Sequence, residues 1–401
     1  MQLGRGRCLS PRPNSSRTSK VDSPRARPPQ PAPAVKNELV AKKGWQHLSS
    51  CIARSEDDDG DMSGNSTQED QTAIKKRRAK GEFVRGVSGF RGVIGDPDFP
   101  IEPGRYHLFV ALNCPWCHRV TLARNMLGLQ ASITMDVAFP NRTGEDDPKG
   151  PNLWQFAPNR LATLTGATLP ECTGETGTGK GLRLAKEIYL AEGSQEQSVP
   201  ILYDKIAGHI VNNESAEIIR MLDLQANGLG STISTVDRVR LLPEDEVLQK
   251  DIHELNDLIY TTINNGAYKA GFSSNQSIYE TAFAAYFDTL ETLEDRLSDG
   301  RPYLTGDQFT EADLRLFPTL YRHDPVYYVR MKLNGAKILD YPHLWRWLCR
   351  VYALPGVAEA GSLVHCRQGY FGRSWNGVVP SGPLKPMPYP EAYLHPDLSA
   401  F

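Results

Sequence analysis

The sequence predicts an α/β domain followed by an all-helical domain. An N-terminal extension without a hydrophobic core precedes both. Short apolar segments alternate with helical patterns over residues 99–228, as expected of an α/β domain. Over residues 246–370, apolar side chains recur every three or four positions, which is typical of packed helices. Residues 1–98 are rich in charged residues, proline and serine, a composition that cannot bury a core. We expect a linker at 229–245 and a C-terminal tail at 371–401.

The extension is basic near its N-terminus. Residues 1–34 contain seven Arg or Lys, one acidic residue and seven prolines. This composition resembles an organellar transit peptide, so one interpretation of residues 1–54 is targeting to a plastid or mitochondrion. The other interpretation is an untargeted disordered tail on a cytoplasmic protein, or an upstream segment that an incorrect gene model adds to the sequence. Residues 55–85 alternate acidic and basic clusters, which is typical of a solvated linker.

The overall composition argues against several classes of partner. The net charge is -2 at pH 7, which gives no electrostatic reason to bind nucleic acid or an anionic membrane. No run of about 18 apolar residues is present, so we expect no membrane-spanning segment. The seven cysteines are scattered and odd in number, which fits a reducing compartment better than a secreted disulfide framework.

The α/β domain is expected to begin with a strand that leads through a Cys-Pro turn into a helix. Pro200 stands directly before the third predicted strand. The expected order is β-α-β-α-β-β-α, which is typical of a thioredoxin-like domain. The predicted elements are strand 106–112, helix 116–127, strand 133–137, helix 182–191, strands 201–203 and 209–211, and a helix that begins at Glu214 and Ser215.

Three helices of the second domain are predicted from apolar spacing and from a capping pattern. The first lies within 246–265 and the second within 279–297, where apolar residues follow helical spacing. Thr310 and Asp313 have the spacing of a capping box, in which both side chains accept hydrogen bonds from free backbone N–H groups at a helix start. The apolar faces of these helices are expected to form the core of the domain.

Cys114 is the residue for which the sequence predicts chemistry most directly. It lies where a predicted strand ends and a predicted helix begins. Free N–H groups and the helix dipole at such a position stabilise a thiolate and lower the pKa of the thiol. Because only the thiolate attacks sulfur efficiently, we expect Cys114 to act as a nucleophile in thiol exchange.

Cys117 leaves two further interpretations open. It lies one helical turn after Cys114, so it is a possible resolving thiol of a dithiol enzyme. A zinc site is the other interpretation, but it needs two more ligands, and Cys349 and Cys366 lack the spacing of a metal site. We therefore expect no metal ion.

Seven short segments carry a resemblance to one known family. They are 114–119, 199–205, 211–220, 264–272, 304–306 together with 311–313, 324–327, and 370–371. In this order they are similar to segments of the glutathionyl-hydroquinone reductases, also called the Xi-class glutathione transferases. The resemblance extends over about residues 85–385. It implies a thioredoxin-like N-terminal domain, an all-helical glutathione-transferase domain after it, and a homodimer.

The resemblance also implies an activity. Enzymes of this family remove the glutathionyl group from S-glutathionyl-hydroquinones. Cys114 is then implied to accept that group as a mixed disulfide and to release the hydroquinone. A second glutathione frees Cys114 and leaves as glutathione disulfide. Glutathione is thus implied as co-substrate, and glutathionylated quinols are implied as substrates.

Four matching positions imply where glutathione binds. Glu214 and Ser215 match residues at a helix N-terminus that bind the γ-glutamyl group. Val199 precedes a proline similar to the cis-proline of the family, so its backbone is implied to pair with the cysteinyl part of glutathione. Trp154 matches a tryptophan that contacts glutathione.

Three tyrosines match family residues that converge on the thiol from the helical domain. Tyr268 is implied to exchange a proton with the ring of the substrate. Tyr327 and Tyr370 are implied to donate hydrogen bonds that stabilise the thiolate.

The chain departs from the family pattern in three places. Cys117 stands where alanine is usual, and Glu196 stands where arginine is usual. Residues 158–181 are interpreted as an insertion or a mis-spliced exon, and 174–180 nearly match a phosphate-binding loop but lack the Ser or Thr that would hold magnesium. Three alternatives stay open: a glutaredoxin-like thiol transferase, a dehydroascorbate reductase, and a non-catalytic binding protein with this fold.

Overall fold

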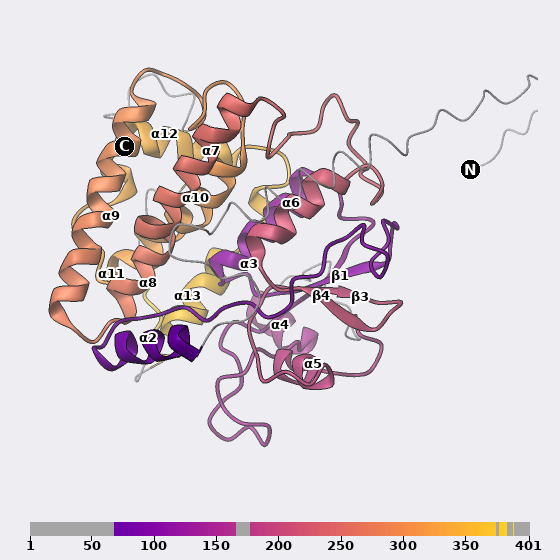
Figure 1. The fold of residues 1–401 in the computed structure, drawn as a ribbon. Coiled ribbons are helices and arrows are strands. Elements are labelled where there is room, and N and C mark those ends of the chain that lie inside the picture. Colours follow the sequence, from indigo (N-terminus) through magenta and orange to yellow (C-terminus); the bar gives the residue numbers. More distant parts are fainter. Residues whose placement is uncertain (1–67, 166–176, 374–376, 383–387, 389–401) are drawn as a thin grey trace, which may run out of the picture. The chain divides into compact units, whose positions relative to one another are not determined.

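The computed structural model describes residues 68–165, 177–373, 377–382 and 388 of the chain (Figure 1). The possible transit peptide within residues 1–54 lies outside the described residues, as do the middle of the predicted insertion and most of the predicted C-terminal tail. Within the described residues, no helix combines the length and the apolar character needed to cross a membrane.

A four-stranded mixed sheet forms the centre of the first domain. Its strands are β1 (Tyr106–Val110), β2 (Thr134–Val137), β3 (Ile201–Asp204) and β4 (His209–Asn212), in the spatial order β2-β1-β3-β4. β1 pairs parallel with β2 and antiparallel with β3, and β3 pairs antiparallel with β4. All of β1 is buried. The predicted thioredoxin-like order is confirmed.

Helices cover both faces of this sheet, which explains why its central strand β1 is buried throughout and mostly apolar. Helices α3 (Pro115–Met126) and α6 (Ser215–Gln225) pack on each other, and α4 (Pro158–Thr165) and α5 (Ala185–Ala191) lie on the other side (Figure 1). Every residue of α3 is buried. This burial arises because α3 also packs against α10 (Glu311–Arg322) of the second domain.

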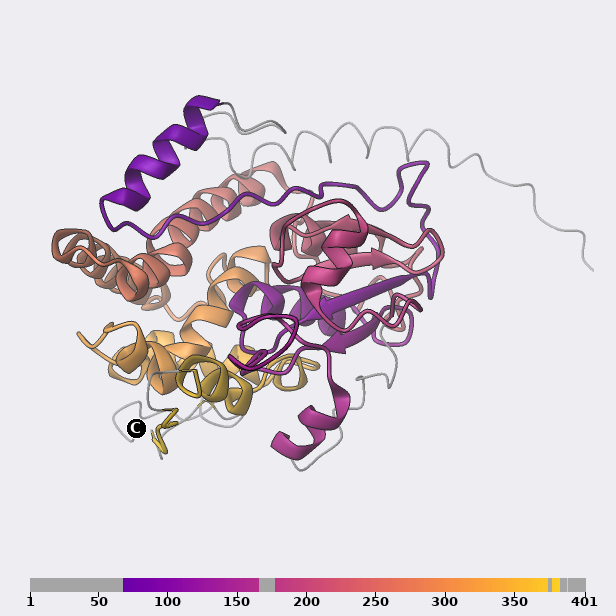
Figure 2. The same cartoon turned by 90° about the horizontal axis from the view of Figure 1, so that it is seen from below.

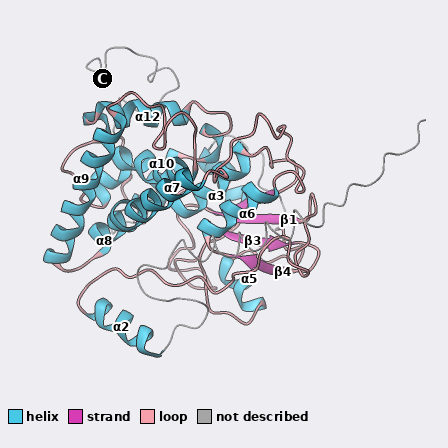
Figure 3. Cartoon of the chain, turned by 45° about the horizontal axis from the view of Figure 1, so that its top comes forward, coloured by secondary structure: helices cyan, strands magenta, loops and turns pink. Residues whose placement is uncertain are grey.

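The second domain is helical, as predicted (Figure 3). The predicted apolar stripes correspond to α7 (Glu246–Leu258) and α9 (Gln276–Leu297), and between these two α7 continues through a π-helical turn into the next helix. Its other elements are η1 (Ile259–Asn264), α8 (Asn265–Phe272), η2 (His323–Tyr327), α11 (Tyr328–Arg330), η3 (Ile338–Asp340), α12 (Pro342–Tyr352), η4 (Ala358–Ala360) and α13 (Leu363–Phe371).

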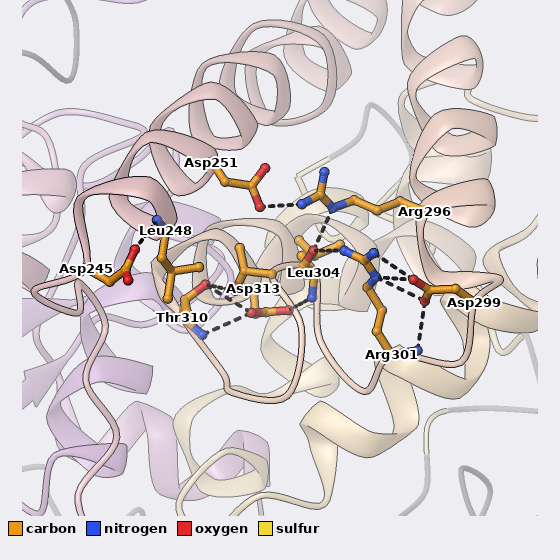
Figure 4. A network of polar contacts seen from close by, with 10 residues as sticks. Asp245, Leu248, Asp251, Arg296, Asp299, Arg301, Leu304, Thr310 and Asp313 are labelled. Carbon is orange, nitrogen blue, oxygen red and sulfur yellow. Dashed lines mark hydrogen bonds and ion pairs between the residues drawn. The ribbon is translucent and has the colours of Figure 1, made fainter.

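The capping box predicted at Thr310 and Asp313 is present at the start of α10 (Figure 4). Asp313 accepts hydrogen bonds from the backbone N–H of Thr310 at 3.0 Å and of Leu304 at 2.9 Å. It also accepts one from the indole N–H of Trp347 in α12, at 2.8 Å. One buried carboxylate therefore ties together α10, the loop before it and α12.

The structure differs from the sequence prediction within residues 68–98, which we expected to belong to the disordered extension. Gln68–Ala79 form helix α2, and residues 81–94, here called the strap, follow it (Figure 2). Phe90 and Val93 of the strap pack against the core. The charge clusters that predicted a solvated linker end near residue 80, whereas these apolar side chains lie beyond them.

The strap forms hydrogen bonds to both domains. The carbonyl of Gly81 accepts one from the N–H of Ser274, in the loop between α8 and α9, at 2.9 Å. At its other end, the N–H of Gly92 donates to the carbonyl of Val211 in β4 at 2.8 Å. The strap therefore joins the helical domain to the outer strand of the sheet.

Candidate active site

The start of α3 forms the centre of the candidate site. Cys114 occupies the N-cap position with φ of −83° and ψ of 124°, and Pro115 is the first helical residue. No side-chain capping hydrogen bond reaches the Cys114 sulfur, but the backbone N–H groups of Trp116 and Cys117 at this helix start lower the pKa of its thiol. The thiol predicted to lie at a helix N-terminus does lie there.

The neighbours of Cys114 favour its ionised form. Burial raises the pKa of this thiol. The thiol and the backbone N–H of Cys117, the positive charge of Arg85 and the N–H of Trp116 together lower it further than burial raises it, and the resulting pKa is about 6. Thiolate is therefore the main form of Cys114 at neutral pH.

A buried arginine of α10 fixes the backbone that leads to Cys114. The guanidinium of Arg322 donates hydrogen bonds to the carbonyl of Leu112 at 2.8 Å and to that of Asn113 at 3.3 Å. A third, longer bond reaches the carbonyl of Cys114 at 3.4 Å. The helical domain thus holds the turn that presents the thiol.

Cys117 is fully buried beneath Cys114. Burial raises the pKa of Cys117 well above its ordinary value, and the neighbouring Cys114 raises it further. Cys117 is therefore protonated at neutral pH and a poor nucleophile. Within the described part of the chain, no group of three His, Cys, Asp or Glu side chains is arranged to hold a metal ion.

Cys114 lines a pocket with a volume of about 730 Å³. The walls come from the strap, the start of α3, the loops after β2, before β3 and after β4, helices α8, α11 and α13, and the segment directly after α13. Of the predicted site residues, Trp154, Val199, Tyr268 and Tyr370 line this pocket together with Cys114.

Val199 presents its backbone to the pocket. The Val199–Pro200 peptide bond is cis, as the resemblance implies. The carbonyl of Val199 lies 3.8 Å from the Cys114 sulfur. Among the described residues, the N–H of Val199 has no hydrogen-bond partner.

Glu214 and Ser215 stand at the start of α6, where the sequence placed them. Glu214 is the N-cap and accepts a hydrogen bond from the N–H of Ala216 at 3.1 Å. Its other oxygen accepts one from the hydroxyl of Ser88 at 3.1 Å. Neither Glu214 nor Ser215 belongs to the pocket wall, which has Ser88 and Asn213 at this end.

The three predicted tyrosines meet through their hydroxyl groups. The hydroxyl of Tyr370 lies 2.8 Å from that of Tyr268 and 3.2 Å from that of Tyr327. Among the described residues, these hydroxyls bond to each other and not to the Cys114 sulfur, so the implied bonds from Tyr327 and Tyr370 to the thiolate are absent. Tyr327 is fully buried behind the wall.

Tyr268 remains protonated at neutral pH. Burial raises its pKa, and the nearby charge of Cys114 raises it further, to about 12. The ring of Tyr268 packs against Phe83 of the strap at 5.6 Å and against Phe272 at 5.5 Å between ring centres. The ring of Tyr268 thus belongs to an aromatic cluster.

Sequence reasoning missed the contribution of the strap to this pocket. Arg85 lies over the ring of Trp116, with its Cζ atom 3.8 Å from the ring centre, next to the helix start that carries Cys114. Sequence reasoning also missed Arg142, Arg330 and Arg373, which line the pocket. The two aromatic and two basic residues within 83–91, directly before the globular region, are the signal that could have indicated the strap.

Glu196, the acidic departure from the family, lines the pocket as well. Its carboxylate accepts hydrogen bonds from the side-chain amide of Asn213 at 2.6 Å and from the N–H of Gly89 at 3.2 Å. Burial nevertheless raises the pKa of Glu196. The site therefore has an acidic group where the family pattern implies a basic one.

Comparisons with known proteins identify relatives of the chain. Residues 113–225 match the family model "Glutathione S-transferase, N-terminal domain", and residues 276–350 match "Glutathione S-transferase, C-terminal domain". The glutathionyl-hydroquinone reductase PcpF of Sphingobium chlorophenolicum is 37% identical over 318 residues, covering 77% of this chain and 92% of that protein. The glutathionyl-hydroquinone reductase YqjG of Escherichia coli is 38% identical over 314 residues, covering 75% and 88%.

Solved structures give the same result. The glutathione S-transferase Xi of Phanerochaete chrysosporium has a TM-score of 0.67 and 36% sequence identity, covering 76% of this chain and 94% of that one. The glutathione-bound structure of YqjG from Escherichia coli has a TM-score of 0.63 and 36% identity, covering 74% and 94%.

Proposed function

The chain belongs to the glutathionyl-hydroquinone reductases, the Xi class of the glutathione transferases, and from this membership we propose that it removes the glutathionyl group from S-glutathionyl-hydroquinones. Glutathione is the co-substrate, and the products are the hydroquinone and glutathione disulfide. The observation that carries the proposal is a thiol with a pKa of about 6 in a pocket that also contains a protonated tyrosine.

In the first step, the Cys114 thiolate attacks the sulfur of the substrate. A disulfide forms between Cys114 and the glutathionyl group, the bond between sulfur and ring carbon breaks, and its electron pair stays on the ring carbon. Tyr268 donates its proton to this carbon, and the hydroquinone leaves. Tyr370, which is hydrogen-bonded to Tyr268, is placed to share the resulting charge.

In the second step, a glutathione thiolate attacks the glutathionyl sulfur of the mixed disulfide. Glutathione disulfide leaves and the Cys114 thiolate is restored. Its pKa of about 6 makes Cys114 a good leaving group at neutral pH. The tyrosine proton is recovered from the incoming thiol, so that substrate and one glutathione yield hydroquinone and one glutathione disulfide.

Binding of the glutathionyl group is proposed to follow the backbone of Val199. Its free N–H and its carbonyl near the Cys114 sulfur suit the peptide groups around the cysteinyl unit of glutathione. Trp154 forms part of the same wall. Glu214 and Ser215 act from behind the wall, through the Ser88 hydroxyl and the N-terminus of α6.

A dithiol, glutaredoxin-like mechanism is the second candidate, because Cys117 lies one helical turn after Cys114 at the start of α3. Full burial and a raised pKa oppose a role for Cys117 as an attacking thiol. The single-thiol mechanism is therefore the better supported one.

Intact-protein mass spectrometry tests the mechanism. The full chain is incubated with an S-glutathionyl-hydroquinone without free glutathione and then digested. We expect one glutathionyl group, carried by Cys114, in the native protein and in Cys117→Ser. The absence of an adduct at Cys114 would contradict the mechanism, and a Cys114–Cys117 disulfide would favour the dithiol one.

A further inference from the structure

Three arginines of the pocket wall come from the loop after β2, from α11 and from the segment after α13. Arg142, Arg330 and Arg373 all line the pocket together with Cys114. Burial and the charge of Arg373 lower the pKa of Arg142 to about 10. Burial and the charge of Arg330 lower the pKa of Arg373. Arg373 therefore lies near enough to both Arg142 and Arg330 for their charges to repel its own, and such a cluster is stabilised by an anion.

Neutral protein groups meet only a few of the hydrogen-bonding needs of this cluster. Arg142 donates to the carbonyl of Asn152 at 3.3 Å, and Arg373 donates to the side chain of the same Asn152. Arg330 donates to the carbonyl of Tyr370 at 3.1 Å. In the part of the chain that the structure describes, no carboxylate forms an ion pair with any of the three. Each guanidinium has five N–H donors, so several remain available.

Arg142 adds two observations that point to a ligand. Its backbone has a φ of 61°, in the left-handed region that non-glycine residues rarely adopt and that is often found at functional sites. Its Nε atom is buried without a hydrogen-bond partner, and such a burial is costly unless something else accepts the bond. The guanidinium lies over the ring of Trp154, with Cζ 3.8 Å from the ring centre, which keeps it directed at the pocket.

We propose that Arg142, Arg330 and Arg373 form a carboxylate-binding subsite of this pocket, an inference that rests on the proposed function. The planar fork of an arginine matches a carboxylate with two parallel hydrogen bonds. Glu196, also on the pocket wall, repels a carboxylate, so the cluster is the favoured place for one. Two molecules of the reaction can supply it: glutathione, through its glycyl carboxylate, and a hydroquinone with an acidic ring substituent.

Kinetics with paired substrates test the subsite and identify the source of the carboxylate. One arm compares glutathione with its glycyl amide as co-substrate. The other arm compares glutathionyl conjugates of hydroquinones with and without a ring carboxylate. One of these molecules supplies the carboxylate that the arginines bind. In the arm that uses this molecule, we expect removal of the carboxylate to lower kcat/KM by about 10- to 100-fold, as for the loss of charge-assisted hydrogen bonds.

The variants Arg373→Gln and Arg142→Gln should reduce this discrimination several-fold, because the charged partners are removed. Arg301→Gln is the matched control, since Arg301 pairs with Asp299 and lies outside the pocket wall; it should keep the native ratio. Equal kcat/KM with and without the carboxylate in both arms, or unchanged ratios in both pocket variants, would overturn the subsite.

A binding measurement separates the subsite from the proposed function. Calorimetric titration of the same proteins with S-methylglutathione and with its glycyl amide needs no turnover. Discrimination in binding without any reductase turnover would support the subsite and refute the function. Turnover without discrimination in either kinetics or binding would support the function and refute the subsite.

Discussion

Burial of Cys114 opposes the negative charge of the thiolate that the reaction needs, and neighbouring groups outweigh this effect of burial. Three of these groups, the thiol of Cys117 and the N–H groups of Trp116 and Cys117, belong to the first turn of α3. The fourth is Arg85, which comes from the strap and is the only one with a full charge among these causes. The thiolate therefore depends on a residue outside both domains.

Arg85→Gln should raise the pKa of Cys114, because a positive charge beside the thiolate is lost. The native thiol ionises with a pKa of about 6, so its alkylation rate should fall as the pH drops through that value. In the variant, the midpoint of the rate against pH should move upward, toward the ordinary value of about 8.5. Alkylation of Cys114 by iodoacetamide between pH 4 and 9, followed by peptide mass spectrometry, measures this midpoint.

Arg85→Lys is the matched control, since it keeps the charge and loses the planar group over Trp116. Its midpoint should stay near that of the native protein. An unchanged midpoint in Arg85→Gln would mean that the helix start alone sets the pKa, and an equal shift in both variants would assign the effect to packing.

Tyr268→Phe should slow the chemical step with little effect on binding. The hydroxyl is the proposed proton donor to the ring carbon, and such a group typically contributes about 100- to 10,000-fold to a rate. The aromatic contacts with Phe83 and Phe272 do not involve the hydroxyl, so the fold should survive. Steady-state kinetics should show kcat lowered by about 100-fold or more, with KM for the glutathionyl-hydroquinone nearly unchanged.

Simple disulfide substrates provide the comparison for Tyr268→Phe, because their leaving sulfur needs less help from a proton. The loss with them should be much smaller. Equal losses on both substrate types would show that Tyr268 tunes the Cys114 thiolate, and no loss on either would remove it from the reaction.

Among the elements, α10 joins the helical domain to the turn that carries Cys114. Arg322 at its end holds the carbonyls before Cys114, and Asp313 at its start anchors the helix. The catalytic turn belongs to one domain and the residue that fixes it belongs to the other. Correct placement of Cys114 thus requires a correctly folded helical domain.

Asp313→Ala should destabilise the protein. Three donors, the N–H groups of Thr310 and Leu304 and the indole of Trp347, lose their shared acceptor in a buried site. Each buried donor left unpaired costs about 1 to 3 kcal/mol, so we expect a loss of about 3 kcal/mol or more in the free energy of unfolding. Urea denaturation followed by circular dichroism measures it.

Asp313→Asn is the conservative companion, because its amide oxygen can still accept hydrogen bonds. It should lose less stability than Asp313→Ala. Equal stability of Asp313→Ala and the native protein would show that the network in Figure 4 does not limit folding.

The elements with regular patterns could be predicted, and those that depend on tertiary contacts could not. The strand before Cys114, the helix after it and the box at Thr310 and Asp313 each have a local signature of a few residues. The strap has no such periodicity, since its order comes from separate contacts with β4 and with the loop after α8. The hydrogen bonds among the tyrosines depend on the angle between α8 and α13, which no local pattern encodes.

For the whole molecule, the family resemblance implies a homodimer, and this assembly stays a prediction. Light scattering of the full chain should give the mass of two chains, and the mass of one chain would contradict it.

Cytoplasmic location, with a plastid or mitochondrion as the alternative, also stays a prediction. Imaging of fluorescent fusions of the full chain and of a chain without residues 1–54 distinguishes the two.

The central claim is that one thiol, Cys114, carries the reaction. Turnover of an S-glutathionyl-hydroquinone by the full chain, with hydroquinone and glutathione disulfide both quantified by chromatography, tests it most directly. Cys114→Ala should fold normally, because a partly exposed thiol contributes little packing, and should lose essentially all turnover. Cys117→Ala should keep most of it and release the two products in equal amounts. Activity of Cys114→Ala within about tenfold of the native enzyme, a difference of only about 1.4 kcal/mol in barrier, would contradict the account.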